Sequence, residues 1–425
     1  MDYKKITFKN GLRLILAPQA GSLAATVLVL VEAGSEYETK KINGISHFLE
    51  HMVFKGTVNR PRVGQIAEEL ACLGAQSNAF TSQEYTGYWA KAESRKLPKI
   101  LDIVSDLYLN PLFNQGEIEK ERGVIIEEIN RYEDTPPRRV QEFFTSLLYG
   151  DQPAGWDIAG KKENIRKIMR DDFLKYRGLH YIAPKTVVAI AGNFNGKKVE
   201  GQIRERFGGL RRYAIVRKRK TSDKQNRAAT FIKFKDSDQS HLVLGVRAFD
   251  LFDKRRYAIE VLAHVLGNYS SMSSRLFKRV REEMGAAYYI DAGADLYLDH
   301  GCLTVSAGVD HKKIELVIKV ILEEMGRLKK ELVDERELQR SKDHIVGNMI
   351  LGLETSDELA GFCGQQEILT RRILPAERLI AKIQGVKVGE VREVAASIFR
   401  NEKLNLAVIG PYKKTQIFNK ILKLQ

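Results

Sequence analysis

The chain has 425 residues, of which 44% are hydrophobic and 29% are charged, and lysine plus arginine outnumber aspartate plus glutamate by 69 to 54. This is an ordinary globular composition, and at this length we expect two or three domains rather than one core. The three cysteines, Cys72, Cys302 and Cys363, form no C-x-x-C pair, so we expect a reducing compartment, no disulfides and no cysteine-based metal site.

The apolar runs and the net charge of the chain indicate where the protein is located and which partners it has. No apolar stretch of signal-peptide type follows the N-terminus, and the longest apolar run, residues 23–31, is shorter than the roughly 20 residues that span a bilayer. We therefore expect a cytoplasmic protein with no membrane partner. The net charge of +15 is spread along the chain apart from residues 217–220, and no DNA- or RNA-binding motif accompanies it, so we expect no nucleic-acid partner.

Strand and helix patterns alternate through the first half of the chain. Strands are predicted on both sides of an Asn10-Gly11 turn within residues 5–17, then at 25–31, at 76–90 as a pair around residues 81–84, and at 187–193. Apolar residues at helical spacing predict a helix after Gly44 and further helices at 63–73, 97–109, 117–132, 140–148 and 161–176. Residues 217–227 lose periodicity and are predicted to be a linker.

The second half repeats this order. A strand pattern at 241–246, helix patterns at 257–266, 317–328 and 337–349, and a strand pattern at 404–410 match elements of the first half in sequence. We therefore predict an α+β fold of two homologous α/β-sandwich domains, each a mixed sheet with helices packed on it, related by internal duplication. The predicted boundaries are 1–215 for the N-terminal domain, 216–228 for the linker and 229–425 for the C-terminal domain.

The stretch His47-Phe48-Leu49-Glu50-His51 lies in a predicted helix and carries metal-type residues. Positions i and i+4 of a helix share one face, about 6 Å apart along the axis, so both imidazoles can bind one zinc ion. Glu50 is on the same side and can act on water rather than on the metal. A five-residue pattern also arises by chance, and histidines on helices are often surface or core groups, so the rest of the chain has to decide.

A third ligand is predicted on the helix at residues 117–132. Its apolar stripe contains Ile118, Ile125 and Ile129, and Glu121 and Glu128 flank that stripe. An inward carboxylate is costly unless it is paired or binds a metal, which favours Glu128 as a ligand. A partly exposed position at the edge of the helix face is an equally simple interpretation of Glu128 from the sequence pattern.

The internal repeat provides a control for the metal hypothesis. When residues 260–264 are aligned with residues 47–51, only the last histidine, His264, is kept. Ser341 and Asn348 stand where the first half has Glu121 and Glu128. The fold therefore does not require these residue types, and the second copy is predicted to lack a metal site, with His264 in a structural role.

Together these residues identify a family resemblance over essentially the whole chain. The chain resembles the M16 metallopeptidases, also called the pitrilysin or inverzincin family, and in particular their short two-domain members. The matching strings are HFLEHMVFKGT at 47–57, NAFT at 78–81 with Glu84, ERGVIIEEI at 121–129, SRLF at 274–277, VRE at 280–282 and Tyr288.

The resemblance implies roles for the residues of the metal motif. It implies one zinc ion per chain, held by His47, His51 and Glu128, and it makes Glu50 the general base that activates the zinc-bound water. Glu121 would orient a metal ligand, and an ordinary surface glutamate is the alternative. The implied function is a zinc-dependent endopeptidase, a hydrolase that cuts peptides or unfolded segments in a chamber.

The resemblance also implies how substrate and partners bind. An extended peptide would add to the sheet edge at Asn78, Ala79, Phe80 and Thr81, with Phe54 beside the scissile bond unless Phe54 is a core residue. Arg281 would hold substrate backbone and Tyr288 would stabilise the oxyanion. The alternatives are an ion pair of Arg281 with a neighbouring glutamate and a core position for Tyr288.

Two-domain members need a second chain to close the chamber, so we expect a homodimer or a pair with a second M16-like chain. The alternative function is a non-catalytic, scaffolding M16-like subunit of a larger complex. Such subunits generally lose motif residues, and this chain keeps them.

Overall fold

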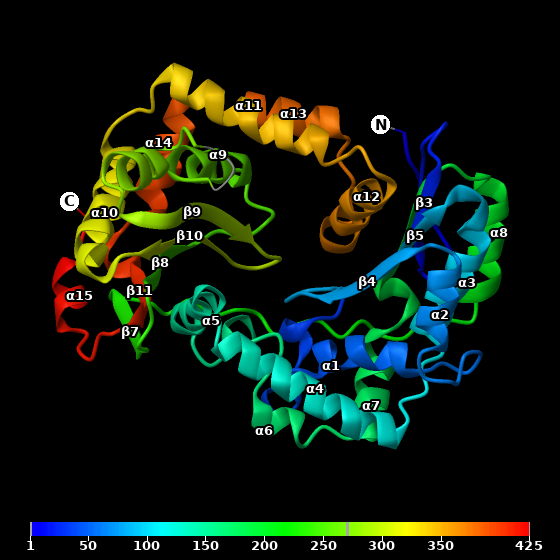
Figure 1. The fold of residues 1–425 in the computed structure, drawn as a ribbon. Coiled ribbons are helices and arrows are strands. Elements are labelled where there is room, and N and C mark those ends of the chain that lie inside the picture. The colour runs from blue at the N-terminus through cyan, green and yellow to red at the C-terminus, as the bar shows by residue number, and fades with distance from the viewer. Residues whose placement is uncertain (1, 269–271, 425) are drawn as a thin grey trace. The chain divides into compact units, whose positions relative to one another are not determined.

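A computed structural model describes residues 2–268 and 272–424 (Figure 1). Residues 1 and 425, the outer ends of the two predicted domains, and residues 269–271 lie outside the described residues. The chain forms two compact units. Unit 1 consists of Met1–Asn130, Trp156–Arg219 and Ile350–Pro375, and unit 2 consists of Arg131–Gly155, Lys220–Met349 and Ala376–Gln425.

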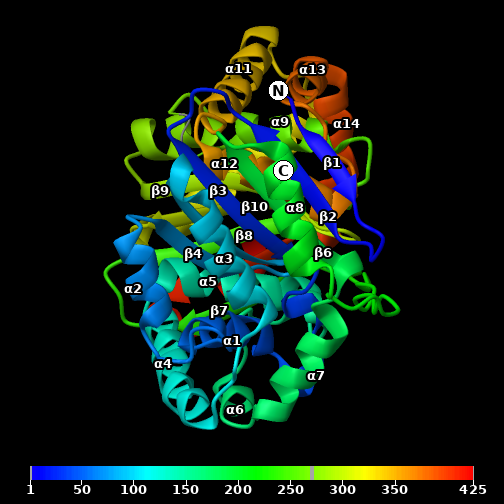
Figure 2. The same ribbon diagram turned by 90° about the vertical axis from the view of Figure 1, so that its right-hand side faces the viewer.

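Unit 1 is built on a six-stranded mixed sheet in the order β1-β2-β6-β3-β5-β4 (Figure 2). Only the β2–β6 pair is parallel, and the other neighbours are antiparallel. Gly11, with φ of 94°, makes the predicted turn between the first two strands. The strands are β1 (Lys4–Thr7), β2 (Arg13–Pro18), β3 (Ala24–Val31), β4 (Gln76–Thr81), β5 (Thr86–Glu93) and β6 (Thr186–Gly192).

Helices cover both faces of this sheet. Helix α3 packs against β3 and β5, and α12 packs against β3 and β6. The helices of unit 1 are α1 (Ile45–Met52), α2 (Gln65–Cys72), α3 (Leu97–Leu109), α4 (Gln115–Glu133), α6 (Lys162–Ile165), α7 (Arg170–His180), α8 (Gly196–Phe207) and α12 (Ser356–Thr370), with a short 3₁₀ turn, η3 (Val53–Lys55), directly after α1. Because both faces are covered, β3 and β6 are almost entirely buried and are apolar except for Thr26 and Thr186, as their sequence pattern predicted.

Unit 2 repeats the architecture with a five-stranded sheet in the order β7-β11-β8-β10-β9. Its one parallel pair, β7–β11, corresponds to β2–β6, and β8, β10 and β9 correspond to β3, β5 and β4. Strand β1 of unit 1 has no counterpart among the described strands of unit 2. The strands are β7 (Ala229–Phe234), β8 (Ser240–Ala248), β9 (Ala287–Leu296), β10 (Gly301–Val309) and β11 (Asn405–Gly410). The matching strand order confirms the predicted duplicated α/β fold.

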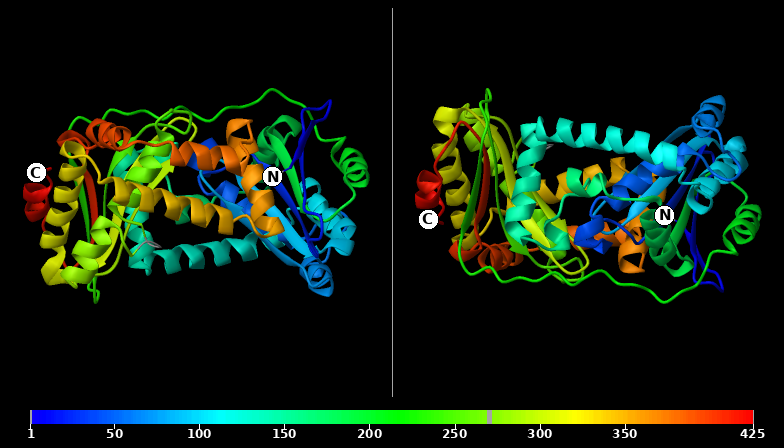
Figure 3. Two further views of the ribbon diagram at one scale, coloured as in Figure 1. Left: turned by 90° about the horizontal axis from the view of Figure 1, so that it is seen from above. Right: turned by 90° about the horizontal axis from the view of Figure 1, so that it is seen from below.

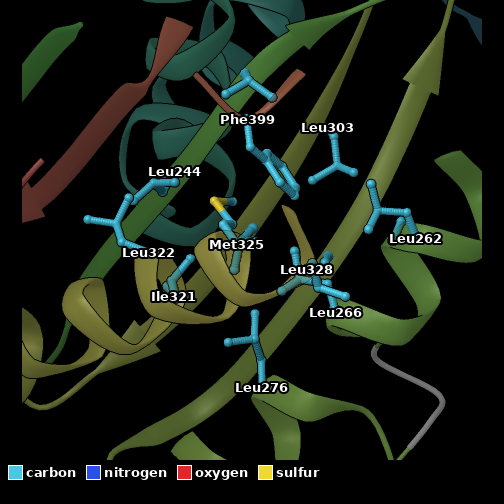
Figure 4. Packing of buried hydrophobic residues seen from close by; sticks show 14 of the residues in the cluster. Leu244, Leu262, Leu266, Leu276, Leu303, Ile321, Leu322, Met325, Leu328 and Phe399 are labelled. Carbon is cyan, nitrogen blue, oxygen red and sulfur yellow. The ribbon is translucent and has the colours of Figure 1, made fainter. Parts of the chain in front are cut away.

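The core of unit 2 lies between its sheet and its helices. Figure 4 shows leucines of β8, β10, α9 and α10 directed into one cluster with Met325 and Phe399. The helices of unit 2 are α5 (Pro136–Tyr149), α9 (Arg256–Leu266), α10 (Ile314–Lys330), α11 (Glu335–Leu351), α13 (Ala376–Gln384), α14 (Val388–Ile398) and α15 (Gln416–Ile421), together with a π-helix, η7 (Phe277–Glu283).

Each unit takes one helix from the other half of the chain. Helix α12 packs its Leu359, Ala360 and Cys363 on the sheet of unit 1, and its fully buried Glu367 pairs with Arg13 and Lys5. Helix α5 packs on β8 and β11 of unit 2. The predicted boundaries follow chain order and so differ from these units, because helical periodicity shows which face is apolar but not which sheet covers it.

The predicted linker and one predicted helix also differ in detail. Residues 211–226 are irregular (Figure 3), and the division between the units at Arg219 falls inside the predicted linker, but Lys218 is buried against Glu36 and Glu84. The single helix predicted at 161–176 is wrong, because the chain forms α6 and α7 with a break between them. The Arg122 guanidinium donates to the carbonyls of Ile165 and Ile168 at this break.

Within the described residues, the structure contains no helix that is both long and apolar enough to cross a membrane.

Candidate metal centre

Helices α1 and α4 bring together the three predicted metal ligands. One ligand atom from each of His47, His51 and Glu128 lies within 4.8 Å of the other two. Nε2 of His47 is 3.7 Å and Nε2 of His51 is 3.4 Å from Oε2 of Glu128, and all three residues are partly buried. Glu128 therefore faces the two histidines across the helix pair.

These separations fit a tetrahedral metal site better than direct hydrogen bonds. Ligand atoms roughly 2.0–2.1 Å from a tetrahedral zinc ion are about 3.3 Å apart, close to both observed distances. A strong charged hydrogen bond would be nearer to about 2.8 Å. Two neutral imidazoles and one carboxylate are also the donor set of a zinc site with one open position. The residues present therefore fit a zinc ion.

The second ring nitrogen of His51 is held by Glu121. Nδ1 of His51 lies 2.9 Å from Oε1 of Glu121, and the Lys55 ammonium lies 2.6 Å from the other oxygen. An N–H at Nδ1 that donates to this carboxylate leaves the Nε2 lone pair directed at Glu128. Burial acts to raise the pKa of Glu121, but His51 and Lys55 hold it below its usual value. Glu121 is nearly buried, so the surface alternative is wrong.

The electrostatics of the ligand cluster favour a bound cation. Burial alone would lower the pKa of His51, but the hydrogen bond to Glu121 and the nearby carboxylates of Glu128 and Glu121 raise it to about 9. Two carboxylates that raise the pKa of an imidazole in this way also attract a metal ion, which competes with the proton for Nε2.

The predicted base, Glu50, lies beside the ligands. Its Oε2 accepts a hydrogen bond of 2.6 Å from the Thr81 hydroxyl on β4. Burial raises the pKa of Glu50 and the nearby Glu128 raises it further, whereas the Thr81 hydrogen bond and His51 lower it. A carboxyl group with a raised pKa next to a metal site is suited to accept and return a proton.

The first turn of α1, which carries His47, is held by a carboxylate outside the helix. Gly44 starts the helix with φ of 102° and offers no side-chain cap. Instead, Glu38 accepts hydrogen bonds from the backbone N–H groups of Gly44 (2.7 Å) and Ser46 (2.8 Å) and from the Asn43 amide (2.9 Å). Burial raises the pKa of Glu38 to about 7 against the effect of these donors. Glu38 therefore fixes the start of the ligand helix.

The predicted substrate residues lie on and near an edge of the unit 1 sheet. Strand β4 is the last strand of that sheet, with Asn78 exposed, Ala79 buried and Phe80 partly buried. Phe54 is partly exposed on η3, directly after the ligand helix, so it is not a fully buried core residue. The substrate roles of these residues stay predictions.

Arg281 and Tyr288 belong to unit 2. Arg281 is exposed on the π-helix η7, with its guanidinium 5.0 Å from the ring centroid of Phe277. Tyr288, the second residue of β9, has 76% of its surface exposed, so the core alternative for Tyr288 is wrong. Their roles in substrate and oxyanion binding stay predictions.

Several residues that support the site were not predicted from the sequence. Lys55 and Glu38 were not assigned roles, and Thr81 was assigned only a main-chain role at the sheet edge. The cap residue Gly44 has no side chain that could accept from the first backbone N–H groups of α1, which is a signal that a more distant acceptor is needed. Nothing in the sequence pattern pointed to Lys55, because a lysine just after a helix is ordinary.

Comparisons with known families agree with this geometry. The model of the family described as insulinase, peptidase family M16, matches residues 14–162, and the model described as the peptidase M16 inactive domain matches residues 167–345. The first match contains all three candidate ligands and Glu50.

Relatives and solved structures match over nearly the full chain. The chain is 32% identical over 409 residues to the uncharacterized zinc protease YmxG of Bacillus subtilis, covering 96% of this chain and 98% of that protein. It is 33% identical over 413 residues to an uncharacterized zinc protease of Rickettsia felis, covering 95% and 96%. The crystal structure of a protease from Helicobacter pylori has the same fold, with a TM-score of 0.89, 23% identity and coverage of 96% and 99%.

Proposed function

Because the chain belongs to peptidase family M16, we propose that it is a zinc-dependent endopeptidase whose metal is held by His47, His51 and Glu128. The observation that carries this proposal is the triangle of ligand atoms at tetrahedral spacing, with the Glu50 carboxyl beside it. The names of the relatives as zinc proteases support the choice of metal.

A zinc ion at these ligands would supply Lewis-acid activation of water and of the peptide carbonyl. The chain supplies the proton transfers. Glu50 takes a proton from the attacking water and then gives it to the nitrogen of the leaving amine. Glu121 keeps the His51 ring in the tautomer that presents Nε2, and Lys55 balances the charge of Glu121.

The proposed substrate is a peptide or an unfolded segment in extended conformation. Strand β4 is the edge strand of the sheet, so an extended peptide can pair with its main-chain groups near Asn78 and Ala79. The Ala79 N–H donates to Oδ1 of Asn78 at 2.9 Å and would exchange this bond for one to the peptide. Thr81, at the end of the same strand, contacts Glu50, which places this edge beside the proposed base. We further propose that the active form contains two chains, either two copies or this chain with a second M16-like chain.

The test combines zinc content with peptide cleavage. Purified protein should contain about one zinc ion per chain and cleave a quenched peptide library in a chelator-sensitive way. Glu50→Gln should keep zinc and lose turnover by roughly 10²- to 10⁴-fold, since it removes the proposed base without removing a ligand. Glu127→Gln is the matched control, because Glu127 is exposed on α4 next to the ligand Glu128.

The outcomes separate the two candidate functions. A chain that binds zinc but cleaves no peptide in the library supports the alternative of a non-catalytic subunit. A chain that binds no zinc contradicts the proposed metal centre. Full turnover in Glu50→Gln would remove Glu50 from the role of base.

A further inference from the structure

Thr81 connects the edge strand of the unit 1 sheet to the proposed base. It is the last residue of β4 and lies opposite Thr86 of β5 in the strand register. Its Oγ1 is 2.6 Å from Oε2 of Glu50 and 3.5 Å from the carbonyl oxygen of Ser46. The hydroxyl has one hydrogen, and the short distance assigns that hydrogen to Glu50.

This hydrogen bond constrains the carboxyl group in two ways. It uses one lone pair of Oε2 and none of Oε1, so Oε1 is the oxygen with both lone pairs left to take a proton from water. It also holds a side chain with several rotatable bonds in one rotamer, fixed to the end of a strand. A proton acceptor must stay within hydrogen-bond reach of the proton that it removes, and a displacement of about 1 Å can cost 10²-fold in rate.

We propose that Thr81 is a positioning residue of the peptidase reaction, whose hydroxyl holds Glu50 in the orientation that presents Oε1 to the attacking water. This inference rests on the proposed function. It assigns a role to the Thr81 side chain, whereas the predicted contact of this segment with substrate uses main-chain groups.

The two roles of the β4 edge make different kinetic predictions. Peptide pairing with β4 depends on backbone N–H and C=O groups, which a side-chain substitution keeps. Loss of the Thr81 hydroxyl should therefore lower kcat and leave KM nearly unchanged. The metal ligands do not contact Thr81 through any hydrogen bond that the structure describes, so zinc affinity should also be unchanged.

The experiment compares three variants with the wild-type chain. Thr81→Val has nearly the same shape without the hydroxyl, and Thr81→Ser restores the hydroxyl without the methyl group. Thr86→Val is the matched control, because Thr86 lies directly opposite in the hairpin and its hydroxyl donates to the carbonyl of Ala33 rather than to Glu50. Zinc affinity is measured for each by competition with a chromophoric chelator, and kcat and KM are measured on one peptide.

We expect Thr81→Val to lower kcat by roughly 10- to 100-fold, with KM and the zinc dissociation constant within about threefold of wild type. Thr81→Ser should recover most of the lost kcat, and Thr86→Val should keep it. A Thr81→Val variant with wild-type kcat overturns the inference. So does a variant that loses zinc, since Thr81 would then support the ligand helix rather than the base, and so does a failure of Thr81→Ser to recover activity. If the wild-type chain itself shows no turnover, both this inference and the proposed function fall, whereas an active wild type with an equally active Thr81→Val removes only this inference.

Discussion

The helix pair α1 and α4 of unit 1 and the helix pair α9 and α11 of unit 2 occupy equivalent places beside sheets of the same strand order. The first pair brings His47, His51 and Glu128 within reach of one ion. The second pair brings His264 and His344 together, with ring centroids 6.0 Å apart. In the part of the chain that the structure describes, α9 and α11 hold no set of three ligand atoms close enough to share an ion.

His51 and His264, which correspond when the two halves of the sequence are aligned, use their two ring nitrogens differently. Nδ1 of His264 lies 3.0 Å from the Glu260 carbonyl and can donate to it, and Nε2 accepts from the Asn268 amide at 3.1 Å. Both ring nitrogens are thus hydrogen-bonded to neutral groups of the same unit, and the nearby carboxylate of Glu260 is 3.6 Å from Nδ1. His51 instead has a carboxylate on each side. Both copies of the fold therefore pack a pair of helices at this place. Only in the first copy do carboxylates of α4 lie beside the histidine, where they favour binding of a cation.

The largest difference between the two helix pairs is expected when His51 and His264 are each replaced by alanine. His51→Ala removes a ligand, so zinc affinity should fall by more than about 100-fold, beyond the range typical of residues that only support a ligand. Turnover should be lost with it. His264→Ala, the matched control in the second copy, should keep both zinc content and turnover. Equal zinc loss in the two variants, measured by metal analysis after dialysis, would contradict a metal centre confined to α1 and α4.

The two histidines should also give opposite pH dependences of stability in the metal-free chain. The pKa of His51 is raised to about 9 despite burial, whereas burial lowers the pKa of His264. His51 therefore contributes up to about 3 kcal/mol to the free energy of unfolding. This contribution is complete below the unfolded pKa of about 6.5 and is lost as the pH rises through about 9. The His264 contribution is present above about pH 6.5 and lost as pH falls below it.

Urea unfolding of chelator-treated protein checks this contrast. The difference in free energy of unfolding between wild type and His51→Ala should shrink from about pH 6 to about pH 9.5, and the difference for His264→Ala should grow over the acidic part of that range. Comparing each variant with wild type at the same pH removes the contribution of other groups, including Glu38, whose pKa is also raised. Parallel curves for the two variants would contradict the opposite environments of these histidines.

Much of the fold followed from periodicity in the sequence. Alternation of helix and strand patterns predicted the strands of the first sheet, the repeat and the place of the ligand helix, because covered strands and amphipathic helices leave strong apolar patterns. In the second sheet it predicted β8 and β11 but not β7, β9 and β10. The break between α6 and α7 was missed, since Arg122, 43 residues before Ile165, satisfies the carbonyls there. The packing of α5 on the sheet of unit 2 and of α12 on the sheet of unit 1 was not predicted. The apolar face of a helix shows that the helix packs on a sheet but not which sheet it packs on.

The clustering of His47, His51 and Glu128 was predicted, but the residues that support them were not. Helical spacing put His47 and His51 on one face of a helix and Glu128 beside the apolar stripe of another, with a partly exposed edge position equally open for Glu128. The family resemblance, and not the spacing, brought the three residues into one predicted site. Lys55, Glu38 and the Thr81 hydroxyl act through contacts between residues far apart in sequence, such as Thr81 and Glu50, 31 positions apart. Such contacts leave no period in the sequence, so only the packed structure reveals them.

The smallest expected difference concerns the residues that flank the ligands, Glu121 and its counterpart Ser341. Glu121→Gln keeps an oxygen that can accept from His51 but removes the charge shared by His51 and Lys55. Zinc affinity should therefore fall by roughly 10- to 100-fold, the usual effect of losing a carboxylate behind a ligating histidine. Ser341→Ala should change it by less than about twofold, because the Ser341 hydroxyl donates to the backbone carbonyl of Glu337 within α11 and supports no ligand. Competition with a chelator measures the zinc affinity of both variants. An unchanged affinity in Glu121→Gln would mean that the metal centre needs the hydrogen bond between residue 121 and His51 and not the charge of residue 121. The difference between the two copies would then depend on the three ligands alone.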